Sequence, residues 1–158
     1  MNKKAIKHSV LALLAMLFLY ACGNKPLYES YVEIKNAEWN KDSIASFKLN
    51  VADTNTFYNF FLHLRNNNDY AYSNFYTFLT ITFPNNKFGK DTLNLPLADL
   101  KGKWLGNGIG EIKSSRFLFK EKLQFPLTGE YTFSIQQGMR KDNLIGITDV
   151  GLEILASE

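Results

Sequence analysis

Hydrophobic and polar residues alternate along most of the chain after residue 30. Phe47, Leu49 and Val51 alternate with Lys48 and Asn50. The same pattern predicts inward faces made of these further residues: Val32 and Ile34; Phe60, Leu62 and Leu64; Phe75, Leu79, Ile81 and Phe83; Leu93, Leu95 and Leu97; Phe117, Phe119, Leu123 and Phe125; Tyr131, Phe133 and Ile135. A period of two with many aromatic residues and threonines is typical of strands, and no segment keeps helical spacing.

The last hydrophobic segment changes phase. Ile145 and Ile147 occupy odd positions, whereas Val150, Leu152 and Ile154 occupy even ones. A shift of one residue turns every side chain to the opposite face of a sheet. One inserted residue near position 149 restores the pattern, so the sequence predicts a β-bulge there.

Turn-forming residues separate the predicted strands. They occur at 67–69 (Asn-Asn-Asp), 84–86 (Pro-Asn-Asn) and 127–129 (Leu-Thr-Gly). About eight strands fit into one domain, and two packed antiparallel sheets bury one face of each strand. We therefore expect an all-β fold over residues 31–158, a single antiparallel β-sandwich of jelly-roll type.

A different pattern precedes the strands. Lysines at positions 3, 4 and 7 are followed by an apolar run from Val10 to Ala21, which is shorter than the roughly 20 residues that span a bilayer. A positive start and a short apolar run are typical of a secretory signal peptide. We expect residues 1–21 to be a signal peptide and residues 22–30 to be a tether.

The single cysteine of the chain directly follows this signal. Leu19-Tyr20-Ala21-Cys22 resembles a lipobox, in which the cysteine thiol takes a diacylglycerol and becomes the first residue of the mature protein. Several acyl chains anchor a protein firmly, because each buried CH₂ contributes about 0.8 kcal/mol. Gly23 follows the cysteine in place of the aspartate that often retains lipoproteins in the inner membrane. We expect an anchor at Cys22 and a place in the outer membrane, facing the periplasm.

Composition narrows the functional classes. The net charge of +3 equals the three lysines of the signal peptide, so a neutral mature chain has no electrostatic reason to bind nucleic acid. His63 is the only histidine after the signal peptide, and no thiol remains beyond Cys22, so we expect no metal site and no cofactor. No nucleophile motif accompanies His63, which we expect to be structural, and the chain is not expected to be an enzyme. Asp149 is expected to bond local backbone at a turn.

One connection, KGKWLGNGIGE at 101–111, is rich in glycine and contains Trp104. We expect a long flexible connection anchored by this ring, which either closes the core or faces a partner. Lys101 and Lys103 flank Trp104 and are expected to remain in solvent, available to an acidic partner.

A second stretch, NNNDYAYSNFYTF at 66–78, gathers aromatic residues beside asparagines. Its aromatic residues are Tyr70, Tyr72, Phe75, Tyr76 and Phe78. Aromatic rings with amides suit sugar rings, although alternating aromatic residues on a half-buried strand usually belong to the core. A glycan is therefore the alternative to a protein as the ligand of this chain.

Several short motifs, in this order and spacing, resemble those of the gliding-motility lipoprotein GldH family. They are Cys22 with its lipobox; Asp91-Thr92-Leu93 leading to Leu95-Pro96-Leu97-Ala98-Asp99; Lys103-Trp104-Leu105-Gly106 with Gly110-Glu111-Ile112; Gly129-Glu130-Tyr131-Thr132-Phe133; Gln137-Gly138-Met139-Arg140; and Gly146-Ile147-Thr148-Asp149-Val150-Gly151. The resemblance covers nearly the whole mature chain. It implies a lipid-anchored, non-enzymatic protein needed for surface gliding, which works beside other gliding proteins and the secretion machinery. Only Cys22 carries over as a functional residue.

Overall fold

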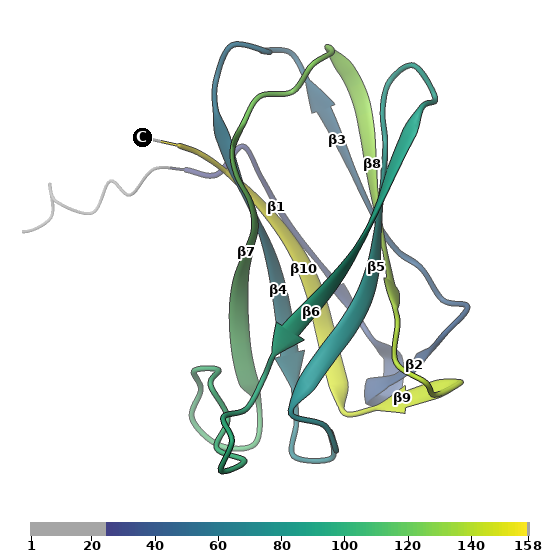
Figure 1. The fold of residues 1–158 in the computed structure, drawn as a ribbon, viewed down its shortest axis with the longest axis vertical. Helices are drawn as coiled ribbons and strands as arrows, with labels where there is room; N and C mark the ends of the chain where they lie inside the picture. The colour runs from purple at the N-terminus through teal and green to yellow at the C-terminus, as the bar shows by residue number, and fades with distance from the viewer. Residues whose placement is uncertain (1–24, 158) are drawn as a thin grey trace, which may run out of the picture.

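The computed structural model describes residues 25–157, which form two antiparallel sheets facing each other (Figure 1). The first sheet contains β1 (Tyr28–Glu33), β10 (Ile147–Ala156), β4 (Tyr58–Asn66) and β7 (Lys113–Leu123), in that order. The second contains β3 (Ala45–Val51), β8 (Gly129–Gln137), β5 (Asn74–Thr82) and β6 (Phe88–Pro96). A 3-10 turn, η2 (Lys35–Ala37), and a short pair, β2 (Glu38–Asn40) with β9 (Asn143–Ile145), complete the fold.

The order of the strands confirms the predicted jelly-roll-like sandwich. Chain neighbours such as β3 and β4, or β6 and β7, lie in opposite sheets, while β10 returns to lie between β1 and β4. This is the arrangement of a jelly roll, in which two Greek keys fold onto each other. The two four-stranded sheets contain the eight expected strands, and the β2–β9 pair was not predicted.

Alternating side chains build the core between the sheets, as the hydrophobic pattern predicts. Every second residue of β3, from Ala45 to Val51, is buried, and the residues between them are exposed. Across the two layers, the Phe60 ring of β4 lies 6.2 Å from the Phe133 ring of β8. Each fully buried side chain of this size contributes about 1.5–3 kcal/mol, so these strand faces supply most of the stabilisation.

The β2–β9 pair closes one end of the core with a tryptophan. Trp39 is 1% exposed and stacks on Phe75, with ring centres 5.7 Å apart. Its indole Nε1 donates a hydrogen bond of 2.9 Å to the Ser43 carbonyl, so the one polar group of the buried ring is satisfied.

The bulge expected in the last strand is confirmed. The pairing of β10 with β4 shifts between Ile147 and Asp149, so that Thr148 is the extra residue. Ile145, however, does not share the inner face with Ile147: it is 47% exposed, and Leu144 is buried instead. The physical reason is Gly146, whose φ of +94° turns the chain between β9 and β10.

Two further details differ from the sequence-based expectation. The sandwich begins at Tyr28 instead of residue 31, because β1 pairs along its whole length with β10. Leu123 is 44% exposed instead of buried, because the pairing of β7 with β4 shifts near Tyr58 and Phe60 before the strand ends. The first strand therefore begins three residues earlier than expected.

The chain enters and leaves at the same end of the sandwich (Figure 1). Tyr28 pairs with Ile154 there, whereas Lys113, at the start of β7, pairs with Asn66 at the opposite end. Among residues 25–157, no helix is long and apolar enough to cross a membrane. The predicted signal peptide and Cys22 lie outside the described residues.

Candidate functional site

The connection from β6 to β7 forms two hydrogen-bonded turns at the end of the sandwich opposite the chain entry (Figure 1). We call residues 97–112 the distal loop. In its first turn, Asp99 Oδ1 accepts hydrogen bonds from the backbone N–H groups of Lys101 (2.8 Å) and Lys103 (2.9 Å). The Asp99 N–H donates to the Lys103 carbonyl at 2.9 Å. These bonds close the turn around its tip, Leu100.

Backbone hydrogen bonds at its base and a lysine side chain close the second turn. Asn107 and Ser114 exchange two backbone hydrogen bonds of 2.8 and 2.7 Å. Lys113 Nζ donates to the carbonyls of Gly108 (3.0 Å) and Gly110 (2.8 Å). The turn therefore holds Ile109 at its tip, and hydrogen bonds define the shape of the connection; the flexibility expected from its glycines stays a prediction.

The tips of both turns are apolar and fully open to solvent. Leu100 and Ile109 have exposed fractions of 108% and 105%, and Leu105 is also exposed. Lys101 and Lys103 are exposed as expected, and neither forms an ion pair with a residue between 25 and 157. Apolar tips beside unpaired cations can bury surface against a partner that carries acidic groups.

Trp104 lies at the base of the distal loop, against the edge of the core. It is half-buried, pairs with Ala98 through a backbone bridge, and its ring centre lies 6.5 Å from that of Tyr70. Tyr70 is buried and donates a hydrogen bond of 2.8 Å to the Asn74 carbonyl, and burial raises the pKa of its hydroxyl group. Trp104 therefore packs against the core at the base of the loop, while Leu100 and Ile109 are fully exposed.

The aromatic stretch at 66–78 divides between the core and the surface. Tyr70 and Phe75 are buried, whereas Tyr72, Tyr76 and Phe78 line a hollow on the outer face of β5. The expected gathering of five aromatic residues is therefore reduced to three that a ligand can reach.

His63 lies on the outer face of the other sheet, bonded to a carboxylate. Its Nε2 donates to Glu153 Oε2 at 2.7 Å, and Arg116 donates to the same carboxylate through Nε (2.8 Å) and Nη2 (3.1 Å). The Arg116 hydrogen bond, and after it the one from His63, holds the pKa of Glu153 below its ordinary value against the opposing effect of burial. With Glu153 bonded on both oxygens, this cluster cross-links three strands.

Asp149 does not bond local backbone as expected. It lies within β10, and its Oδ1 is 4.0 Å from Arg65 Nη1 on β4. The part of the chain that the structure describes contains no group of three or more His, Cys, Asp or Glu residues placed to hold a metal ion.

Leu100 and Ile109 were not among the residues predicted from the sequence. Their signal was available, because both are large aliphatic residues placed beside turn residues and outside the period-two pattern. Cys22 lies outside the described residues, so its lipidation remains a prediction.

Solved structures share only a distant likeness with this chain. A mitogen derived from Yersinia pseudotuberculosis has a TM-score of 0.37 and 7% identity, covering 85% of this chain and 89% of its own. TmCBM61, solved in complex with β-1,4-galactotriose, also has a TM-score of 0.37, with 9% identity over 82% of this chain and 88% of its own. Likeness at this level supports no functional comparison.

Sequence relatives are much closer. A protein of Christiangramia forsetii named gliding motility lipoprotein GldH homolog is 40% identical over 150 residues, which is 90% of this chain and 91% of the relative. The gliding motility lipoprotein GldH of Flavobacterium johnsoniae is 36% identical over 156 residues, or 94% and 96% of the two chains. The family model described as GldH lipoprotein matches residues 26–154. By both comparisons, this chain belongs to the GldH lipoprotein family.

Proposed function

We propose that this protein is a lipid-anchored, non-enzymatic accessory of the gliding and secretion machinery, which binds its protein partner through the distal loop. Cys22 carries the lipid, and the domain faces the periplasm from the outer membrane. Relatives named as gliding motility lipoproteins support the cellular role.

The observation that carries the proposal is the pair of fully exposed apolar tips, Leu100 and Ile109. Burial of aliphatic side chains against a partner stabilises the complex by roughly 25 cal/mol per Å² of apolar surface removed from water. Hydrogen bonds hold both turns in place, so little conformational entropy is lost when a partner binds.

The position of the loop favours a protein partner over the membrane surface. Leu27, directly before β1, already donates a backbone hydrogen bond to Ile154; it lies five residues after Cys22, and five extended residues span at most about 17 Å. The distal loop lies at the other end of strands about 30 Å long, since a nine-residue strand rises roughly 3.3 Å per residue. With the lipid at Cys22, the apolar tips therefore reach away from the bilayer.

Replacement of both tips by serine tests the proposal in cells. We expect a Leu100→Ser/Ile109→Ser protein to melt like wild type, because neither side chain is buried, and to lose colony spreading and the recovery of its partner from the envelope. Phe88→Ser is the matched control, since Phe88 is 70% exposed and lies in β6 outside the loop. Normal spreading by the double variant would exclude the distal loop as the contact surface.

The charged part of the surface has its own test. We expect Lys101→Glu/Lys103→Glu to weaken the same interaction and to make it less sensitive to salt, because exposed cations act over roughly 8 Å at physiological ionic strength. Interaction unchanged by this double variant would remove the two lysines from the contact.

A further inference from the structure

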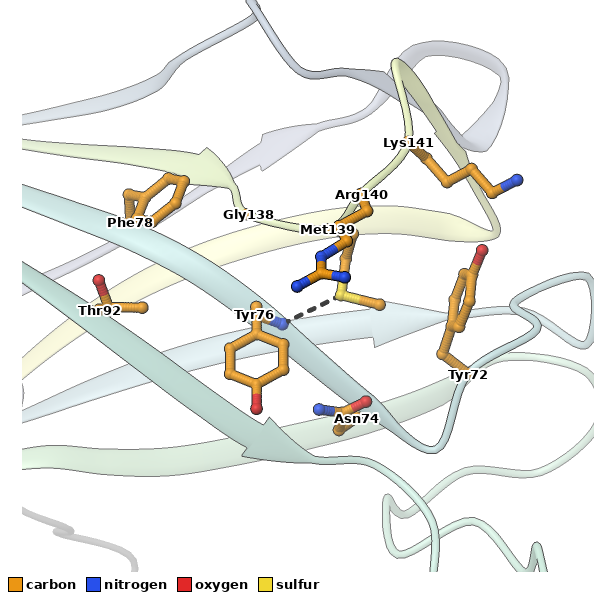
Figure 2. Close-up of a pocket in the computed structure, with 9 residues that line it drawn as sticks. All are labelled: Tyr72, Asn74, Tyr76, Phe78, Thr92, Gly138, Met139, Arg140 and Lys141. Atoms are coloured by element: carbon orange, nitrogen blue, oxygen red, sulfur yellow. Dashed lines mark hydrogen bonds between the residues drawn. The ribbon is translucent and has the colours of Figure 1, made fainter.

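A hollow of about 600 Å³ opens on the outer face of β5, beside the turn from β8 to β9 (Figure 2). Its volume falls in the range of sites that bind small ligands, roughly 300–1,000 Å³. It shares no residue with the distal loop, so its role is separate from the proposed protein contact.

Aromatic rings form one side of the hollow. Tyr76 and Phe78 alternate with buried residues of β5, so their side chains point away from the core. They are 42% and 36% exposed. Tyr72 adds a third ring near the turn, as Figure 2 shows. Flat aromatic surfaces of this kind pack against the C–H faces of pyranose rings, and tyrosine adds a polar hydroxyl group at its edge.

Neutral polar groups lie between the rings and the neighbouring strand. Asn74 lines the hollow, and its Nδ2 donates to Asn94 Oδ1 on the neighbouring strand at 2.8 Å, which leaves Asn74 Oδ1 as an acceptor for a ligand. Thr92, on β6 opposite Phe78, adds a hydroxyl group. Paired donors and acceptors next to aromatic rings match the hydroxyl groups of a sugar.

Buried hydrogen bonds hold the β8–β9 turn against the hollow. Gln137 is 2% exposed; its Nε2 donates to the Lys141 carbonyl at 2.7 Å, and its Oε1 accepts from the Met139 N–H at 2.9 Å. Gly138 donates to the Tyr76 carbonyl at 2.7 Å, so closely that a Cβ there would lie 3.2 Å from that oxygen. The turn is therefore fixed before any ligand arrives.

The charge of the hollow is positive. Arg140 and Lys141 approach it from the turn, and the Arg140 guanidinium points toward β5 in Figure 2. Neither forms an ion pair within residues 25–157, and no carboxylate lines the hollow. Asp142, the next residue, is already paired with Lys41 at 2.7 Å. Guanidinium groups bind carboxylates and sulfates through paired hydrogen bonds.

We propose that this hollow binds an acidic oligosaccharide, whose sugar rings lie on Tyr76 and Phe78 and whose carboxylate or sulfate is held by Arg140. The aromatic rings and amides bind the sugar rings and hydroxyl groups, and the unpaired cations favour a ligand that carries negative charge. An acidic peptide would satisfy the cations but would use neither the flat rings nor the paired amides.

Calorimetric titration of the purified full-length protein in detergent tests the proposal with three probes. Short oligogalacturonides supply acidic pyranose rings, their methyl esters supply the same rings without charge, and oligoglutamate supplies the charge without the rings. We expect the oligogalacturonides to bind at least about tenfold more tightly than either of the other probes, which is the difference expected when a charge-assisted hydrogen bond is lost.

Two variants separate the parts of the site. Arg140→Gln should weaken oligogalacturonide binding by about tenfold and leave the methyl ester unaffected, whereas Tyr76→Ala should weaken both by about fivefold. Phe88→Ala, on the same outer face but outside the hollow, should change neither.

Three results would overturn the proposal: no oligogalacturonide binding at concentrations up to about 1 mM; equally tight binding of oligoglutamate; or Arg140→Gln and Tyr76→Ala titrations identical to wild type. Loss of the distal-loop contact in the serine variants would leave these titrations unchanged, so the two proposals can fail separately.

Discussion

Arg116 clamps Glu153 through two hydrogen bonds, from Nε at 2.8 Å and from Nη2 at 3.1 Å, while its guanidinium lies 3.3 Å from the centre of the Phe61 ring. The pair joins β7 to β10 across the intervening β4, from which His63 also donates to Glu153. Because only 13% of the Glu153 side chain is exposed, water screens these bonds less than it screens an ordinary surface pair.

Because of the Glu153 cluster, we expect the free energy of unfolding to depend on pH. Because the folded-state pKa of Glu153 lies below its ordinary 4.5, its contribution is complete above pH 4.5 and is lost as the pH falls through the folded-state value. We expect Glu153→Gln to lower the free energy of unfolding by about 1–2 kcal/mol near neutral pH. Urea unfolding of both proteins at about pH 7 and about pH 3 measures the difference, which should shrink at the lower pH; a difference independent of pH would refute the assignment.

Truncation of the two tryptophans should lower the free energy of unfolding by different amounts. Trp39 is 1% exposed, so Trp39→Ala should cost about 3–5 kcal/mol, whereas the half-buried Trp104 should cost about 1–2 kcal/mol. Chemical denaturation of the two variants beside wild type tests both values. A Trp104→Ala protein as unstable as Trp39→Ala would place Trp104 in the core, and one as stable as wild type would show that its contact with Tyr70 contributes nothing.

Gly146 occupies a position from which even a methyl group is excluded. Its φ is +94°, and a Cβ would lie 2.3 Å from the backbone nitrogen of Tyr70. We expect Gly146→Ala to cost about 3 kcal/mol or more, because both strain and overlap must be relieved. Gly89→Ala is the matched control: nothing lies within 4 Å of its Cβ position, so the free energy of unfolding should change by less than about 0.5 kcal/mol. Equal melting temperatures for the two variants would contradict this account.

Lipidation of Cys22 can be tested by removing its thiol. Cys22→Ala removes the only thiol of the chain, so we expect it to abolish labelling by a fatty-acid analogue, to prevent lipoprotein cleavage and to abolish activity in the cell. Gly23→Ala keeps the thiol and should label as wild type does. Labelling of the Cys22→Ala protein at the wild-type level would show that the lipid, if any, is carried elsewhere.

The strands and their buried faces could be predicted from the sequence because their signal is local. Phe47, Leu49 and Val51 alternate with polar residues whatever the rest of the chain does, and the phase change before Val150 required an extra residue whichever strands lay beside it. Turn residues likewise separated the strands without any knowledge of their partners.

Only the tertiary structure decided which residues from distant segments meet. Nothing local distinguishes Trp39 as the tryptophan of the core from Trp104 at its edge, because burial depends on the β2–β9 pair closing over it. Tyr76 and Arg140 reach one hollow because β5 pairs with β8, and strand pairing over such distances depends on the whole fold. The pairings of β6 with β5 and of β7 with β4 hold Leu100 and Ile109 at the end of the sandwich opposite the chain entry, a relation that no local pattern of hydrophobic residues contains.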